Sequence, residues 1–228
     1  MPRIHKILAR LASFALPCLL SMPVSAFELN GSKWPTNEIE FYVSIDGRAG
    51  SGISWNAAFI AAMEDWNDAT SFNFIVRKEK KNPCGYDGFN SVDFSDDYCG
   101  SAFGENTLAI AVASYQSAIL GEPTISEANI IVDQTKQFNI FDGNLVQFGI
   151  QGVDFRRVAL HELGHAIGLG HETSNKAIMA PSISNLDRLQ PDDIAGAEKL
   201  YDGSINCAVA DLAFGLTSNA LNSTDCTV

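Results

Sequence analysis

The chain has 228 residues and a formal net charge of -12 at pH 7, from 15 Lys and Arg against 27 Asp and Glu. This excess of negative charge argues against nucleic acid and anionic membrane surfaces as partners. The length suits one domain with a substantial hydrophobic core, and we expect a monomer.

Residues 1–26 have the pattern of a secretory signal peptide. Basic residues come first, a mostly apolar stretch follows at 11–20, and Val24-Ser25-Ala26 offers a small-residue cleavage site. The apolar stretch contains Pro17 and is shorter than the roughly 20 residues that span a bilayer. We therefore expect cleavage after Ala26 and export without a membrane anchor, to the outside of the cell or to the periplasm of a Gram-negative host.

Four cysteines follow the signal segment, and they allow three disulfide connectivities. We favour Cys84–Cys99 and Cys207–Cys226, because each pair closes one local polar loop in an oxidising compartment. The second pair would staple a tail at 203–228. A zinc site made of cysteines alone is the rival interpretation, although no close Cys-x-x-Cys spacing is present.

The first half of the chain predicts strands around one helix. Residues 38–44 alternate in polarity and form the first expected strand. A helix over 55–68 follows, with Ser54 as its cap, and 71–77 is the next strand. A strand, a helix and a strand in this order predict a parallel pair. A short strand is expected at 92–95.

The second half predicts two more strands, at 107–114 and 128–132, and then two helices. The first helix begins at Asp154, which can cap it, and continues to Leu169; the second covers Pro191 to Tyr201. The whole order predicts an α/β (α+β) architecture, in which the strands come early and the chemistry lies on a late helix.

Three of the four histidines of the chain lie within eleven positions. His161 and His165 are four residues apart, so a helix places both imidazoles on one face where they can bind one ion. Gly168 can end the helix and turn the chain so that His171 becomes a third ligand. Three imidazoles and a water make an open zinc site, and Glu162 lies where a general base can reach that water. Histidines that merely decorate a helix surface rarely have this spacing.

The segment His161-Glu-Leu-Gly-His165-Ala-Ile-Gly168-Leu-Gly-His171 resembles the zinc motif of the metzincin metalloendopeptidases. Residues 177–181, Ala-Ile-Met-Ala-Pro, look like the Met-turn of that clan, in which Met179 would support the metal site from below. Within the clan the chain is most similar to the matrixin-like branch. The resemblance covers about 33–202, and its further matches lie at 33–35, 55–74 and 189–201.

The resemblance implies a zincin fold with a twisted, mostly parallel five-stranded sheet, an antiparallel edge strand, two long helices and a C-terminal helix. It also implies a catalytic domain over 27–202 that is a secreted zinc metalloendopeptidase. Zn²⁺ would be held by His161, His165 and His171, with Glu162 as the base. Extended protein or peptide substrates would pair with an edge strand that includes Thr107, Leu108, Ala109, Ile110 and Ala111, above a side-chain pocket bordered by 180–186.

The sequence also departs from the matrixin pattern. No cysteine lies between Ala26 and Trp34, so we do not expect a pro-domain with a cysteine switch, and Glu172 stands where matrixins usually have serine. Too few histidines remain for a second histidine-ligated zinc. Calcium is a further candidate ion because four acidic residues gather in one loop, although solvation is the ordinary explanation for such a run; they are Asp93, Asp96, Asp97 and Glu105.

Two other functions remain open from the sequence. The same scaffold could bind a peptide or matrix protein without cutting it, because a fold does not guarantee an activity. A zinc hydrolase that acts on smaller peptides is the other alternative. The presence of Glu162 beside a complete set of three ligands favours the endopeptidase, since a protein that only binds has no use for a base at the metal.

Overall fold

The computed structural model describes residues 27–117, 123–147, 149–173 and 176–202. The expected signal segment and the expected tail, with Cys207 and Cys226, lie outside the described residues. In the described part, no helix combines the length and the apolar character that crossing a membrane requires.

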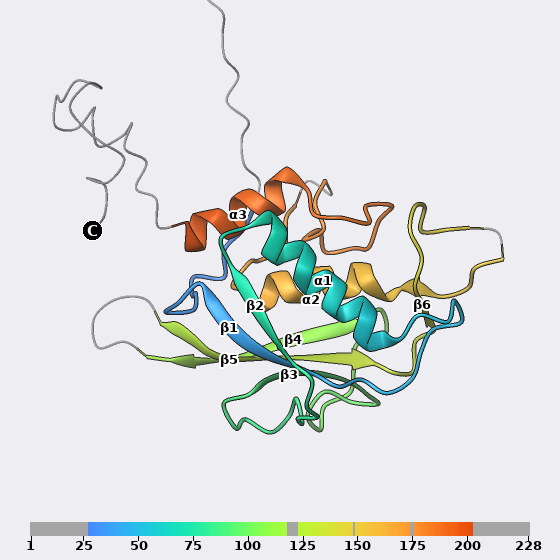
Figure 1. Ribbon diagram of the computed structural model, residues 1–228, viewed down its shortest axis with the longest axis horizontal. Helices are drawn as coiled ribbons and strands as arrows, with labels where there is room; N and C mark the ends of the chain where they lie inside the picture. Colours follow the sequence, from blue (N-terminus) through green and yellow to red (C-terminus); the bar gives the residue numbers. More distant parts are fainter. Residues whose placement is uncertain (1–26, 118–122, 148, 174–175, 203–228) are drawn as a thin grey trace, which may run out of the picture.

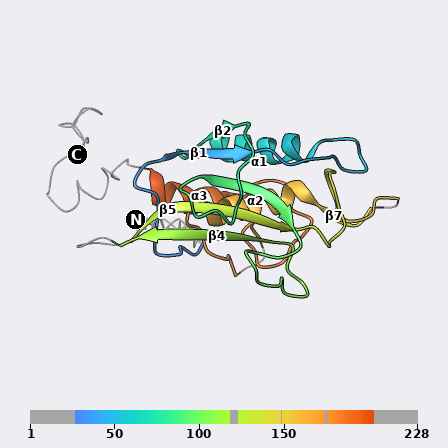
Figure 2. The same cartoon turned by 90° about the horizontal axis from the view of Figure 1, so that it is seen from below.

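The centre of the molecule is a five-stranded sheet with the strand order β2-β1-β3-β5-β4 (Figures 1 and 2). Four strands are parallel, and β4 pairs antiparallel with β5 at one edge, as the resemblance implied. The strands are β1 (Glu38–Val43), β2 (Asn73–Arg77), β3 (Asn90–Ser95), β4 (Ala109–Gln116) and β5 (Thr124–Asp133). A small parallel sheet of β6 (Phe138–Asn139) and β7 (Val153–Asp154), which the sequence did not predict, precedes the second helix.

Three helices lie on the same side of the sheet (Figure 1): α1 (Trp55–Ala69), α2 (Phe155–Ala166) and α3 (Pro191–Tyr201). The core fills the space between them and the strands. Phe59 and Trp66 of α1 are fully buried, and Phe59 contacts both Phe41 of β1 and Phe155 of α2. The helix that carries the histidines therefore rests on a rigid aromatic layer.

The edge strand differs from the prediction at both ends. It begins at Ala109 rather than Thr107, because the backbone N–H of Thr107 donates to Gly104 in a turn. It then continues to Gln116 through an irregularity in register between Ser114 and Tyr115. Such irregularities locally bend a strand and change the direction of its side chains.

The histidine helix ends at Ala166, three residues earlier than the sequence predicted. Gly168 has a φ of 103°, in the region that favours glycine, and its N–H donates to His165 O while the N–H of Leu169 donates to Gly164 O. These two bonds form a Schellman motif, which stops the helix and satisfies its last carbonyls. The expectation that Gly168 turns the chain is confirmed, although the helix before it ends sooner than predicted.

The Cys84–Cys99 disulfide, one of the two that the sequence favoured, joins the segment between β2 and β3 to the segment between β3 and β4. Of the acidic residues that suggested calcium, Asp93 lies in β3, whereas Asp96, Asp97 and Glu105 lie between β3 and β4. Asp93 pairs with Lys80 at 2.5 Å, and Asp97 accepts a hydrogen bond from the N–H of Gly100 at 2.7 Å. Each of these two carboxylates thus has a partner from the protein itself.

Candidate active site

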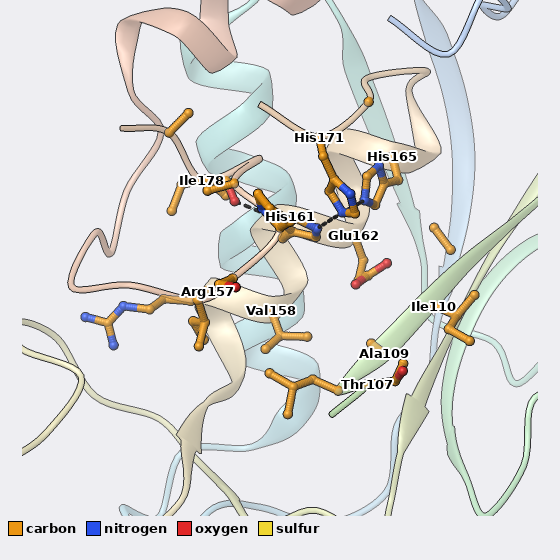
Figure 3. Close-up of a pocket in the computed structure, with 18 of the residues that line it drawn as sticks. Thr107, Ala109, Ile110, Arg157, Val158, His161, Glu162, His165, His171 and Ile178 are labelled. Atoms are coloured by element: carbon orange, nitrogen blue, oxygen red, sulfur yellow. Dashed lines mark hydrogen bonds between the residues drawn. The ribbon is translucent and has the colours of Figure 1, made fainter. Parts of the chain in front are cut away.

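A cleft of about 710 Å³ separates α2 from the edge strand β4. Residues of α2 form one wall, β4 and the residues before it form the other, and 180–184 with Leu186 line the end where we expected a side-chain pocket. All five predicted edge-strand residues line the cleft, including the two that precede the strand: Thr107, Leu108, Ala109, Ile110 and Ala111. Figure 3 shows the histidines facing this space from the helix side.

The three histidines converge on one point although they come from two segments. His161 and His165 lie one turn apart on α2, and His171 returns after the Gly168 turn. The Nε2 of His171 is 3.3 Å from that of His161 and 3.2 Å from that of His165. Four tetrahedral ligands at the usual Zn–N distance lie about 3.3 Å apart, so the spacing fits a zinc ion. Among the described residues, this is the one group of three such side chains close enough to share a metal.

Backbone carbonyls fix the orientation of the two helix histidines. The Nδ1 of His161 is 2.7 Å from Ile178 O, and the Nδ1 of His165 is 2.8 Å from Leu169 O. With a proton on each Nδ1, both Nε2 atoms present lone pairs to a metal. Burial lowers the pKa of His161 to about 3, with a further lowering from the neighbouring His165, and burial also lowers the pKa of His165. Both rings are therefore neutral at pH 7, as ligands must be.

Glu162 points from the helix toward β4, beside the histidines (Figure 3). Glu162 is only 6% exposed, and its carboxyl accepts a hydrogen bond from the backbone of Ala111. Burial raises the pKa of Glu162 to about 8 in the metal-free protein. A nearby cation would oppose this rise, since positive charge favours the carboxylate. Burial and a bound cation thus shift the pKa of this carboxyl in opposite directions.

Met179 lies directly below the histidine helix and is 2% exposed. Its sulfur packs so closely on Gly164 that a methyl group at this glycine would overlap it. The backbone N–H groups of Ile178 and Met179 donate to the two carboxylate oxygens of Asp193, at 2.9 and 3.0 Å. Asp193, on α3, is 1% exposed, and burial raises its pKa. One buried side chain thus holds the segment whose carbonyl orients His161.

Sequence reasoning missed the roles of Arg157, Asp193 and Asn30 around the site. Arg157 lines the cleft one turn before His161, is buried, and donates to Leu186 O at 2.9 Å and to Gly143 O. Its position on the helix face could have indicated this, because residues four apart share a face. Asp193 and Asn30 act through contacts with distant segments, and the local sequence contains no signal for those contacts.

Comparisons with known proteins agree with the geometry. The family model described as matrixin matches residues 33–202, which include the three histidines and every residue that lines the cleft except Asn30. Metalloendoproteinase 2-MMP of Arabidopsis thaliana is 28% identical over 179 residues, which are 76% of this chain and 44% of that protein. Matrilysin of Homo sapiens is 44% identical over 54 residues, 22% of this chain and 20% of that protein.

Matrix metalloproteinase-19 of Mus musculus is 48% identical over 54 residues, 22% of this chain and 10% of that protein. The chain thus spans less than half of the length of these relatives. The matching profile, however, covers most of the chain and both walls of the cleft. The family implies a catalytic zinc, and the three histidines fit one. The chain belongs to the matrixin family.

Proposed function

We propose that the protein is a secreted zinc metalloendopeptidase that hydrolyses internal peptide bonds of extended protein substrates. One observation carries this proposal: three Nε2 atoms converge beside the buried carboxyl of Glu162, in a cleft that an edge strand borders. We assign the catalytic domain to residues 27–202. Export follows from the pattern of the first 26 residues, and we propose that the enzyme acts outside the cytoplasm as a monomer.

His161, His165 and His171 would hold the zinc ion. When bound, zinc polarises the scissile carbonyl and makes the attacking water more acidic. The protein contributes three imidazole rings, and backbone carbonyls hold two of them, His161 and His165, in place. Because the protein supplies three ligands, the fourth position of a tetrahedral zinc ion would stay open toward the cleft.

Glu162 would act as the general base and then as the general acid. It accepts a proton from the attacking water and delivers it to the amine that leaves. A group that does both must gain and lose a proton near the working pH, and the burial of this carboxyl raises its pKa toward that range. The hydrogen bond from Ala111 holds the carboxyl between the metal position and the edge strand.

The edge strand would align the substrate. β4 is the last strand of the sheet, and its residues line the cleft, so an extended peptide can add to it as a further strand. Main-chain hydrogen bonds would then fix the peptide backbone across the histidines. The side chain that follows the cleaved bond would enter the pocket between α2 and 180–186.

The test compares the wild type with Glu162→Gln, which keeps the size of the side chain but removes its proton exchange. With casein as substrate we expect at least about a 100-fold loss of kcat, the usual contribution of a general base, with one zinc retained per chain. Glu64→Gln, on the exposed face of α1, is the matched control and should keep full activity.

If both proteins bind zinc and neither cleaves casein or a broad peptide library, the endopeptidase proposal fails. A partner search would then test a scaffold that only binds peptides. Cleavage limited to short peptides would instead indicate the hydrolase of smaller substrates.

A further inference from the structure

We propose that Asn30 is a positioning residue of the metal site, which holds the carbonyl that orients His165 and the link that leads to His171. The inference rests on the proposed zinc chemistry, and it adds a residue that lies 135 positions before the ligand it supports.

The segment 28–30 lies along the link between the second and third histidines. Leu29 forms an antiparallel bridge with Leu169. On either side of this bridge, the N–H of Asn30 donates to Gly168 O at 2.9 Å and the N–H of Gly170 donates to Glu28 O at 2.7 Å. The conformation of the link is therefore defined by a strand-like partner from the other end of the domain.

The side chain of Asn30 adds a contact that the backbone pairing does not need. Its Nδ2 donates a hydrogen bond to Leu169 O at 2.9 Å. The same oxygen accepts a second hydrogen bond from Nδ1 of His165 at 2.8 Å. A carbonyl oxygen has two lone pairs, so it can accept both donors at once. The amide thus restricts the carbonyl that sets the tautomer and the ring orientation of His165.

His161 has support of the same kind from a different element. Its carbonyl partner belongs to Ile178, whose own N–H is held by Asp193 of α3. Both helix histidines are thus backed by a carbonyl, and each carbonyl segment is held by a polar side chain from a distant part of the chain. Asn30 is the counterpart of Asp193 for the second ligand.

Close packing leaves the link little room to adopt another path. A Cβ atom at Gly170 would lie 3.1 Å from Glu28 Cγ and 3.2 Å from Asn30 Oδ1, and one at Gly168 would meet Ser32 O at 2.5 Å. Glycines on both sides of Leu169 therefore permit the approach of the N-terminal segment. Without that segment, the same glycines would leave the link free to move.

Asn30 also lines the cleft, so a direct contact with substrate is the alternative role. The two roles differ in what they change. A substrate contact alters KM and leaves zinc binding unchanged, whereas a positioning residue alters zinc release when no substrate is present.

The experiment measures the rate of zinc release from the purified protein to an excess of chelator, together with the unfolding of the metal-free protein. Asn30→Ala and Asn30→Asp both lack the donor, and only the second adds a negative charge. Glu28→Gln changes an exposed neighbour and keeps the backbone pairing, so it serves as the control. We expect both Asn30 variants to release zinc about 10-fold faster or more, the usual effect of removing an outer-shell partner.

Wild-type rates in both Asn30 variants, with or without a rise in KM, would overturn the inference. Faster release that occurs in Asn30→Ala alone would also overturn it, because the donor is missing from both. A wild type that binds no zinc would instead refute the proposed function, and the inference with it. Loss of stability in the metal-free variants without faster zinc release would show a purely structural role.

Discussion

The carboxyl of Glu162 and the ring of His161 are neighbours whose burial has opposite consequences for stability. Burial raises the pKa of Glu162 from 4.5 to about 8, so between these values the folded metal-free protein keeps a proton that the unfolded chain has lost. The contribution of this group to the free energy of unfolding therefore falls as pH rises from 4.5 to 8. His161, with its pKa lowered from 6.5 to about 3, makes a contribution that falls as pH decreases from 6.5 to 3.

Glu162→Gln should separate these two effects in the metal-free protein. Glutamine resembles the neutral carboxyl and does not titrate, so the variant escapes the loss that the wild type suffers as pH rises. We expect the Tm of the variant relative to the wild type to increase from pH 5 to pH 8, measured by thermal unfolding with a chelator present. A difference in Tm that stays constant over this range would contradict the raised pKa.

The residues of the site divide by how far along the chain their partners lie. His161, Glu162, His165 and His171 could be predicted because helix geometry and one glycine turn relate them within eleven positions. The partner of Asn30 lies 139 residues away. No periodicity or short motif reports a contact of that span, so only the folded chain reveals it.

Gly164 is the point where α2 meets the Met179 segment. Alanine at a helix interior normally stabilises by about 1 kcal/mol relative to glycine. Here the added methyl would overlap the sulfur of Met179 and approach Trp66, and overpacking a core costs about 1–3 kcal/mol. We expect Gly164→Ala to lower the free energy of unfolding, as measured by urea denaturation, despite its better helix propensity.

The double variant Gly164→Ala, Met179→Ala provides the control for this prediction. If the overlap causes the loss, alanine at 164 should cost less when the methionine side chain has been removed. An equal cost in both backgrounds would mean that the packing against Met179 is not the reason.

The sequence predicted every helix of the described residues and the five strands of the main sheet, but it misplaced some of their ends. The histidine helix was predicted too long because Ile167 and Leu169 continue its apolar face, while the backbone had already turned through the Schellman motif. The edge strand was predicted too early because Thr107 has β propensity, and its N–H is used in a turn. The short pair β6 and β7 has too few residues to show any periodicity.

Tyr201, at the end of α3, connects the N-terminal segment to the end of α2. The Tyr201 hydroxyl donates to Ile167 O at 2.6 Å and accepts from the N–H of Trp34 at 3.0 Å, and both contacts are buried. Trp34 also donates through Nε1 to Ala166 O at 2.9 Å. The end of the histidine helix is thus held from both ends of the domain.

Tyr201→Phe should lower the free energy of unfolding by about 1–3 kcal/mol, because it leaves two buried backbone groups without their partner. We expect a lower midpoint of urea denaturation with an unchanged slope. Tyr42→Phe, which removes an exposed hydroxyl contact with Glu40, is the control and should change the midpoint little. Equal midpoints for Tyr201→Phe and the wild type would show that the hydroxyl is not a structural link.

The strand order of the domain was implied by family resemblance and not by the residues alone. The pattern of a strand, a helix and a strand predicted that β1 and β2 are parallel, and this is confirmed. It gave no reason for β3 to pair with β1 or for β5 to lie between β3 and β4. Those choices depend on side-chain packing across the whole sheet, which local propensity does not determine.

Because the protein contains few histidines, their imidazole signals can report on the metal site without an added probe. Four histidines occur in the sequence, one of them in the segment that we expect to be removed, and the other three form the converging group. Isotope labelling of histidine alone would therefore give, within residues 27–228, imidazole NMR signals from these three residues and from no others. These signals would follow metal loading and inhibitor binding on the unmodified protein, without an introduced probe.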